Sequence, residues 1–461
     1  MRINLPAIGQ SYKHDDLPLS AQVTRNWFPE LNTETSVAVS LQPWPGAVVF
    51  SEGPTGLDRG MSGWYFHLYK VTDQTLYKID ENGAYTTVGT IAGTGRCTFL
   101  SSSEWLVIVT SGKVYTYDGG TLAEVTDVDL EAPSYGAYLN NQWIYSGTGS
   151  RFAVSDVADP TSVNGLSYAT AEAASDLIAV PFVHNQTLYL FGYGHIESWY
   201  NSGVGSPPMD RIEGGVIHKG LASGAIGSLS SNDNYVYFLG DDRRVYQLVG
   251  AQVRSISTVP IARELEAATL TDVIGFCFSM YGQEFYQLRV VGKTFVFNET
   301  AGAWFELSVG LDERQHPATS YFYGFGKHLI ADGGNVLELS KDASLYNSEP
   351  IIRTRVSGLI SGELLGQDFI GRPLFMSRCE IIIKGIPPLG DAPQIMLSWS
   401  DDAGYTWSNE RVIDCGETGN YTFKAVAHQL GRFYDRVLRI RISDESAYSL
   451  HRVSGDIDVG A

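Results

Sequence analysis

The chain has 461 residues, 44% of them hydrophobic and 18% charged, which predicts a folded protein of two or three domains and excludes a disordered one. Asp and Glu number 51 against 32 Lys and Arg, so the net charge is −19. Because affinity for nucleic acid depends on neutralising phosphates with Lys and Arg, this charge balance argues against a protein that grips DNA, but not against one that DNA slides past.

The first 57 residues are predicted to form an extended N-terminal docking arm. They show few periodic strands and contain six prolines, Pro6, Pro18, Pro29, Pro43, Pro45 and Pro54. The N-terminus lacks the apolar region of a secretory signal, and no run approaches the ~20 apolar residues that a bilayer span requires. We therefore expect a soluble protein with no membrane span.

Residues 58–355 contain a repeat of short, mostly aromatic runs. Seven such runs, each expected to be an inner strand, start 38 to 49 residues apart, and a second alternating run follows each after 8 to 12 residues. A hairpin repeated every ~40–50 residues is typical of the four-stranded blades of a β-propeller. The seven first runs are Trp64–Phe66, Trp105–Val107, Trp143–Tyr145, Leu188–Leu190, Val236–Phe238, Phe285–Tyr286 and His328–Ile330.

Seven hairpins predict a propeller of six or seven blades, since one hairpin could belong to a neighbouring layer. The turn residues agree, because Asp241-Asp242 and Gly333-Gly334 each lie between two of the runs. Stacked antiparallel meanders or sandwiches are the alternative. Helix signal is sparse, and residues 260–268 form the one short candidate, with Pro260 where a helix can begin.

Residues 356–461 change character and predict a C-terminal antiparallel domain that resembles a β-sandwich. Short apolar runs there, such as "CEIIIKGI", "QIMLSWS" and "RVLRIRIS", are spaced like sandwich strands. The predicted fold class is therefore all-β, with an N-terminal arm (1–57), a propeller (58–355) and a β-rich C-terminal domain (356–461).

The C-terminal domain contains the stretch "SWSDDAGYTWSN" at residues 398–409, which has the form of an Asp box. In this hairpin turn the Asp and Ser cap backbone groups, and the Trp is expected to pack beneath the hairpin. One good copy is present, outside the propeller repeat, whereas sialidase propellers repeat the box in several blades. We interpret it as a structural turn formed by Ser400, Asp402, Gly404, Thr406 and Trp407.

The sequence offers no catalytic, cofactor-binding or metal-binding residues that we would assign. Adjacent acids at Asp15-Asp16, Asp241-Asp242 and Asp401-Asp402 could supply acid–base chemistry, but each pair lies beside turn residues or in the arm. The nine histidines show neither HxH nor HExxH spacing. Four well-separated cysteines predict reduced thiols packed as small hydrophobic groups in a reducing cytoplasm.

Segments along most of the chain resemble the packaged-DNA stabilisation proteins of short-tailed bacteriophages, also called tail hub or nozzle proteins. The resemblance starts with "NWFPE" at 26–30 and "PWPGAVVF" at 43–50. It continues through Asp159-Pro160-Thr161-Ser162, Ala171-Glu172 with Asp176, Ile196–Gly203 and Arg254–Ser257, and it ends with "PLFMSRCEIIIKG" and the Asp-box segment. Each motif is weak alone, and their shared order over about 400 residues carries the resemblance.

This resemblance implies structural work in a virion. Members of the family form a hexameric ring below the adaptor ring of a portal–tail machine. They close the channel that holds packaged DNA and carry a needle, fibres or tailspikes. The protein is then made in the bacterial host cytoplasm and ends in the phage tail, with DNA passing through the channel without tight binding. The resemblance supplies no catalytic residues, and the alternatives are a sialidase-like carbohydrate-active enzyme or a receptor-binding adhesin.

Overall fold

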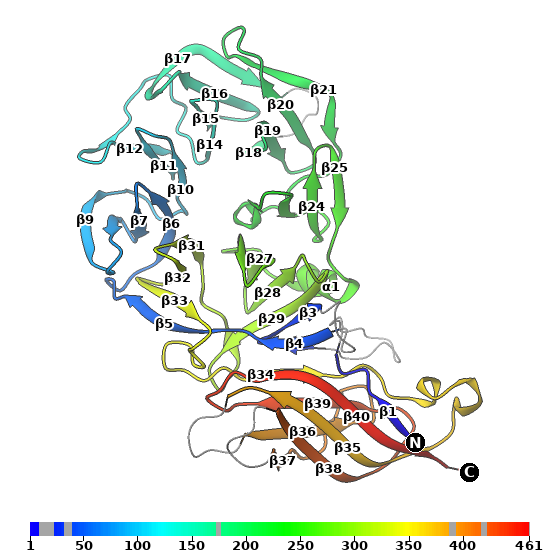
Figure 1. Ribbon diagram of the computed structural model, residues 1–461. Helices are drawn as coiled ribbons and strands as arrows, with labels where there is room; N and C mark the ends of the chain where they lie inside the picture. Colours follow the sequence, from blue (N-terminus) through cyan, green and yellow to red (C-terminus); the bar gives the residue numbers. More distant parts are fainter. Residues whose placement is uncertain (9–22, 32–38, 172–176, 387–392, 416–421, 461) are drawn as a thin grey trace.

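Seven blades of four antiparallel strands form a ring, and a sandwich of strands lies at one side of it (Figure 1). This computed structural model describes residues 1–8, 23–31, 39–171, 177–386, 393–415 and 422–460. The arrangement confirms the predicted all-β class. The sequence left open whether the propeller has six or seven blades, and the structure has seven.

Each of the first six blades is a meander of four consecutive strands, and apolar clusters fill the space between neighbouring blades. The first four blades are β6 (Asp58–Trp64), β7 (His67–Thr72), β8 (Thr75–Ile79) and β9 (Tyr85–Thr90); β10 (Thr98–Ser101), β11 (Leu106–Thr110), β12 (Lys113–Tyr117) and β13 (Leu122–Glu124); β14 (Gly136–Leu139), β15 (Gln142–Ser146), β16 (Arg151–Asp156) and β17 (Asp159–Thr170); and β18 (Ile178–His184), β19 (Thr187–Gly192), β20 (Ile196–Asn201) and β21 (Met209–Ile217).

The remaining blades include one strand from the N-terminal segment. They are β22 (Ser230–Ser231), β23 (Val236–Leu239), β24 (Val245–Val249) and β25 (Gln252–Ser255); β26 (Ile274–Met280), β27 (Gln283–Val290), β28 (Lys293–Asn298) and β29 (Ala303–Val309), which also pairs β30 (Arg314–Gln315); and β31 (Ser320–Gly324), β32 (Lys327–Asp332), β33 (Asn335–Ser340) and β5 (Gly46–Ser51). The predicted short helix is confirmed as α1 (Val259–Ala267), and a 3-10 turn, η1, covers Ile226–Ser228.

In six of the seven blades the aromatic run lies on the second strand, not on the inner strand that we predicted. The innermost strands are the preceding ones, β6, β10, β14, β18, β22, β26 and β31, several of which contact the first strand of the next blade. Second strands such as β11 and β15 are buried along their whole length between neighbouring blades, which explains their large apolar side chains. In the first blade the run Trp64–Phe66 ends β6 and forms the turn, so β7 begins only at His67.

The described parts of residues 1–57 are built into both domains and do not form the separate arm that we predicted. Strand β5 pairs with β33 and closes the ring as the outermost strand of the seventh blade. Strand β1 (Arg2–Asn4) pairs with β40, and β3 (Trp27–Leu31) pairs with β4 (Val39–Pro43), which also reaches β40. The partners of β1 and β5, and the β40 partner of β4, lie hundreds of residues away in the sequence, so composition alone could not reveal these pairings.

The C-terminal strands form the two sheets of a sandwich, as predicted. One sheet contains β35 (Leu374–Lys384), β38 (Thr422–Phe433) and β40 (Ser449–Val459) beside β1, β3 and β4; the other contains β34 (Arg353–Val356), β36 (Gln394–Ser400), β37 (Arg411–Asp414) and β39 (Val437–Ile442). The core between them includes Ile381, Ile440 and Leu450 together with Trp27 of the N-terminal segment. Two 3-10 turns, η2 (Gly362–Leu364) and η3 (Gln367–Phe369), precede β35.

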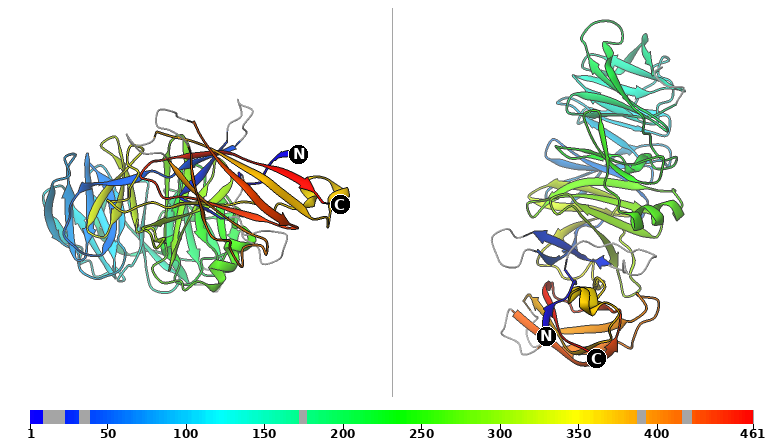
Figure 2. Two further views of the ribbon diagram at one scale, coloured as in Figure 1. Left: turned by 90° about the horizontal axis from the view of Figure 1, so that it is seen from below. Right: turned by 90° about the vertical axis from the view of Figure 1, so that its right-hand side faces the viewer.

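A short strand joins the propeller to the sandwich. Strand β2 (Thr24–Arg25) pairs in parallel with β29 of the sixth blade and antiparallel with β34 of the sandwich. One sheet therefore runs from β26 in the propeller through β2 to β37 in the sandwich. Seen from its side, the molecule is elongated, with the propeller on edge above the sandwich (Figure 2).

Candidate functional site

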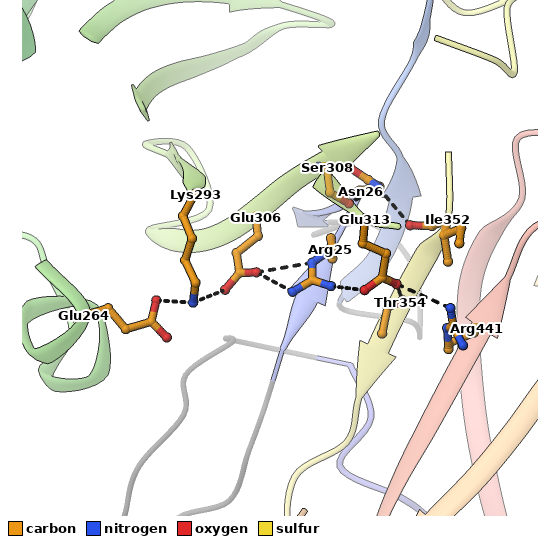
Figure 3. A network of polar contacts seen from close by, with 10 residues as sticks. All are labelled: Arg25, Asn26, Glu264, Lys293, Glu306, Ser308, Glu313, Ile352, Thr354 and Arg441. Atoms are coloured by element: carbon orange, nitrogen blue, oxygen red, sulfur yellow. Dashed lines mark hydrogen bonds and ion pairs between the residues drawn. The ribbon is translucent and has the colours of Figure 1, made fainter. Parts of the chain in front are cut away.

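The junction between propeller and sandwich is held by a chain of ion pairs centred on Arg25. Because β2 lies between β29 and β34, the Arg25 side chain reaches acids of the sixth blade and of the loop that follows it. Its Nη2 and Nε lie 2.8 Å and 3.2 Å from one carboxylate oxygen of Glu306, and its Nη1 donates to Glu313 (Figure 3). The three side chains are only 18–24% exposed, so solvent screens these contacts weakly.

The chain of charges continues in both directions from Arg25. On the propeller side, Lys293 Nζ lies 3.8 Å from Glu306 and 2.5 Å from Glu264 of α1. On the sandwich side, Arg441 of β39 lies 3.5 Å from Glu313 and 3.0 Å from Glu410 (Figure 3 shows the first of these contacts). Positive and negative groups alternate along the whole path, so each charge has an opposite neighbour.

Burial and charge oppose one another at Arg25, and also at Arg439, which lies beside the last carboxylate of this path. Burial by itself would lower the pKa of Arg25, and the carboxylates of Glu306 and Glu313 raise it above its ordinary value. At Arg439, which lies 3.8 Å from Glu410, burial lowers the pKa. Arg25 is therefore firmly charged, and its replacement would leave two partly buried carboxylates without their shared cation.

A buried amide beside Arg25 fixes the same junction without charge. Asn26 is 1% exposed and has a left-handed backbone with φ of 57°. Its Nδ2 donates to Ser308 Oγ at 3.1 Å and to the Ile352 carbonyl at 2.8 Å, and its Oδ1 accepts from the Ser308 backbone N–H at 2.9 Å. Asn is suited to this position because it tolerates the left-handed region and offers both donor and acceptor.

The Asp-box turn lies at the end of β36, close to the sandwich end of the ion-pair chain. Ser400 Oγ donates to Asp402 at 2.6 Å and accepts from the Gly404 N–H at 2.8 Å. Asp402 also accepts from the Thr406 N–H at 2.8 Å and from the Thr406 hydroxyl. These hydrogen bonds from Ser400 and Thr406 lower the pKa of Asp402 to about 2.

The sequence predicts that Trp407 packs beneath the hairpin. In the structure Trp407 is only half-buried. The guanidinium carbon of Arg439 lies 4.4 Å from the centre of the Trp407 ring. Trp399 is flanked in the same way by Arg411 at 4.7 Å and Arg436 at 5.6 Å. Stacked arginines therefore replace much of the apolar cover that sequence reasoning assigned to the tryptophan.

The acid pairs are occupied by structural contacts where the structure describes them. Asp241 and Asp242 lie 3.0 Å and 3.2 Å from Lys219, and Asp401 binds the buried Arg436 at 2.6 Å. Asp15 and Asp16 fall outside the described residues. Within the described ranges, no group of three or more His, Cys, Asp or Glu side chains is placed to hold a metal ion.

A second buried network, which the sequence analysis missed, connects the first and last blades. The Lys70 ammonium and Asp58 carboxylate are 0% and 1% exposed and lie 2.9 Å apart. Asp58 also accepts from Thr319 and Ser320 of the seventh-blade region at 2.8 Å and 2.7 Å, and Lys70 donates to the Gly333 carbonyl at 2.7 Å. The available signal was Lys70 within the otherwise apolar run "HLYKVT".

The contacts described above hold the two domains, and the first and last blades, together. Among the residues that the structure covers, no helix is long and apolar enough to cross a membrane. What the geometry provides is mechanical continuity, since one sheet and one chain of charges cross from the propeller into the sandwich.

Comparisons with solved structures return chains of low similarity. A computationally designed protein, Ika8, is 12% identical over 64% of this chain and 99% of its own, with a TM-score of 0.42. The Neurospora crassa Pan2 WD40 domain is 10% identical over 64% and 94%, with a TM-score of 0.42. The WD40 propeller domain of Doa1 is 11% identical over 64% and 96%, with a TM-score of 0.39. No curated protein sequence matches significantly.

Two family descriptions match the chain in the order of its two domains. Residues 1–344 match the family described as "Bacteriophage P22 Gp10, beta-propeller", and residues 373–458 match "Bacteriophage P22 Gp10, beta-sandwich". The first match includes the N-terminal segment that supplies β5 to the propeller. The chain therefore belongs to the bacteriophage P22 Gp10 family and is a structural, DNA-stabilising protein of a phage tail.

Proposed function

We propose that this protein is the tail hub, or nozzle, of a short-tailed phage. In this proposal six copies form a ring that closes the DNA channel and stabilises the packaged DNA. The ring attaches on one side to the portal–adaptor assembly and on the other to needle, fibre or tailspike proteins. The protein is made in the host cytoplasm and acts in the virion.

The observation that best supports this role is the continuity of sheet and charge between the two domains. Strand β2 pairs with both β29 and β34, and Arg25 binds acids on the propeller side. A channel closure must withstand the force of packaged DNA, and two domains tied by a flexible linker would move separately. A shared sheet makes them resist load as one body.

The charge of the chain supports passage of DNA without tight binding. With a net charge of −19 on each copy, six copies bring −114 around the channel. Binding to DNA gains free energy when cations displace counterions from phosphates, and a mainly acidic surface offers little of this. DNA is therefore expected to move past the ring without being held.

Imaging of tails is the direct test. Cryo-electron microscopy of intact virions should show six copies of this propeller and sandwich below the portal–adaptor assembly. Particles made without the protein should package DNA and then lose it, measured as nuclease-sensitive DNA. Copies found only at the tips of fibres, or full retention of DNA without the protein, would contradict the proposal. Cleavage of a glycan by the purified chain would favour the sialidase-like alternative, and specific glycan binding would favour the adhesin.

A further inference from the structure

The outer surface of the β35–β40 sheet carries four cations around a single carboxylate. Glu380 of β35 is 3% exposed at its side chain and contacts all four of them. Arg378 Nη2 lies 2.7 Å from it, Lys424 Nζ 2.8 Å and Arg452 Nη2 3.8 Å, and Arg2 Nη2 donates to its Oε1. We call these four cations the basic face.

The basic face has more positive charge than its acids can balance. Asp456 lies 3.9 Å from Arg378, so four cations face two carboxylates and two positive charges remain, although the chain as a whole carries −19. Burial by itself would raise the pKa of Glu380, and Lys424 and Arg2 lower it, so the carboxylate stays ionised. Arg2, Lys424 and Arg452 are 47–53% exposed and can still contact another molecule.

The outer edge of the third blade has the opposite character. Asp127 and Asp129 precede the blade, and Asp127 accepts from the Val163 N–H of β17 at 3.1 Å, which fixes this loop on the blade. Asp156 and Asp159 face one another across the β16–β17 turn. We call these four residues the acidic edge; with them lie three exposed aliphatic side chains, Val128 (96% exposed), Val157 (67%) and Leu166 (76%).

Charge complementarity and position both favour contact between different copies of this chain. Acidic groups that surround exposed aliphatic side chains are typical of a protein interface, where apolar anchors are surrounded by a polar rim. Strand β17 and the β35–β40 sheet lie at opposite ends of the molecule in Figure 1 and in the right-hand view of Figure 2, so the two surfaces cannot pair within one chain.

We propose that the basic face of one copy docks on the acidic edge of a second copy. The contact is head-to-tail, since different surfaces meet, and a repeated head-to-tail contact generates a ring or a helix. The number of copies in the ring is taken from the proposed function. This inference adds which two surfaces of neighbouring copies are in contact. It also supplies local attraction between copies whose net charges repel.

A second copy fits the basic face better than DNA does. Specific or non-specific DNA binding by proteins commonly neutralises about 6–10 phosphates, whereas this face has an excess of two charges beside a strongly acidic molecule. The acidic edge of a second copy needs fewer cations, because it presents only four carboxylates and its exposed aliphatic side chains also contribute to binding.

Charge reversal of each surface tests the contact. Lys424→Glu with Arg452→Glu makes the basic face acidic and changes the net charge from −19 to −23. Asp129→Lys with Asp156→Lys makes the acidic edge basic and changes it from −19 to −15. Self-association of the full chain is measured by sedimentation up to millimolar concentration, since a Kd of ~1 mM is already weak. A salt concentration of about 0.15 M limits long-range repulsion.

We expect each double variant alone to associate at least about tenfold more weakly than the wild-type chain. A 1:1 mixture of the two should associate again, because each then meets an oppositely charged surface, although both chains remain strongly negative. Recovery in the mixture also shows that both variants are folded. The matched control is Arg244→Glu with Arg254→Glu, which makes the same charge change on exposed residues of the fifth blade and should associate like the wild type.

Three outcomes would overturn the inference. The first is a wild-type chain that stays monomeric throughout, and the second is a mixture that does not recover association. The third is binding of a short DNA duplex that the basic-face variant loses, which would assign the face to nucleic acid. Six copies on the tail together with any of these results would leave the proposed function standing. Absence from the tail, with association in solution intact, would contradict that function and not this contact.

Discussion

Arg25, one of the two residues of β2, donates two hydrogen bonds to the same carboxylate oxygen of Glu306. The pair joins a strand of the N-terminal segment to the outermost strand of the sixth blade. Since β2 also pairs with β34, this contact lies where load passes from the propeller to the sandwich. It gives the N-terminal segment a structural role in the junction.

Replacing Arg25 with Met should weaken the connection between the two domains. The carboxylates of Glu306 and Glu313 would keep their partly buried positions without a shared cation, at a cost of about 2 kcal/mol. In urea unfolding, the wild type should show closely coupled transitions, and the variant should show the sandwich melting first. Arg314→Met, at the exposed pair with Glu349, is the control and should change little. Unchanged coupling in Arg25→Met would contradict the role assigned to this residue.

Asp58→Asn should open the seam between the first and seventh blades. It leaves the Lys70 ammonium buried without its counter-charge, which typically costs about 3–5 kcal/mol. We expect a large fall in the free energy of unfolding and faster hydrogen exchange at the β5–β33 pairing that closes the ring. Glu124→Gln, at the exposed pair with Lys113, provides the comparison. Equal effects of the two substitutions would show that the buried pair does not stabilise closure.

Phe66→Asn should stabilise the propeller. Phe66 is 95% exposed and adopts a left-handed backbone with φ of 59°, which costs a bulky residue about 1 kcal/mol or more. The same position in the third blade is Asn141, at φ of 63°. The reciprocal change, Asn141→Phe, should lower the melting temperature, and the pair of measurements separates backbone strain from other effects of the side chain. A lower melting temperature for Phe66→Asn would sink this explanation.

The stability of the propeller should fall as the pH drops below neutrality because of His316. Burial, with the nearby Arg289 cation, lowers the pKa of His316 to about 3, whereas an unfolded histidine has a pKa of about 6.5. Between these two values only the unfolded state takes up the proton. Stability is therefore full above pH ~6.5 and is lost progressively down to pH ~3.

His316→Asn should remove this part of the pH dependence. Its side-chain oxygen can accept from the Ala318 N–H, as His316 Nδ1 does at 3.4 Å. Unfolding in urea between pH 7 and pH 4 gives the slope of stability against pH, and the wild-type slope should exceed that of the variant by up to ~1.4 kcal/mol per pH unit. Identical slopes for wild type and His316→Asn would refute the assignment.

Trp407→Ala should lower the stability of the sandwich only moderately. A fully buried tryptophan would cost about 3–5 kcal/mol on truncation, but Trp407 is half-buried and stacked on Arg439, so we expect roughly 1–2 kcal/mol. Thermal unfolding checks the size of the effect. A loss of stability as large as that of a core residue such as Ile440 would show that the ring is covered more completely than the contacts indicate.

The sequence by itself determined the all-β class, the seven hairpins and the order of propeller and sandwich. Strands such as β11 and β15 are buried between neighbouring blades, so each must be apolar along its length, and this requirement repeats with every blade. The Asp-box residues were also visible, because the turn needs an Asp, a Ser and a Gly at fixed spacing and its hydrogen bonds are local. Local chemistry and regular repetition leave a readable pattern.

Only the tertiary structure decided how the N-terminal segment, the blade seam and the domain junction are built. Strand β5 closes the ring by pairing with β33, and Arg25 meets Glu306 from 281 residues away. Asp58 meets Lys70 within one blade, but another of its partners, Ser320, lies 262 residues away from Asp58 in the sequence. A pairing between distant residues leaves no period or spacing in the sequence, since it depends on where folding brings each strand. The same reason kept the basic face hidden, because Arg2, Glu380 and Arg452 become neighbours only when β1, β35 and β40 share a sheet.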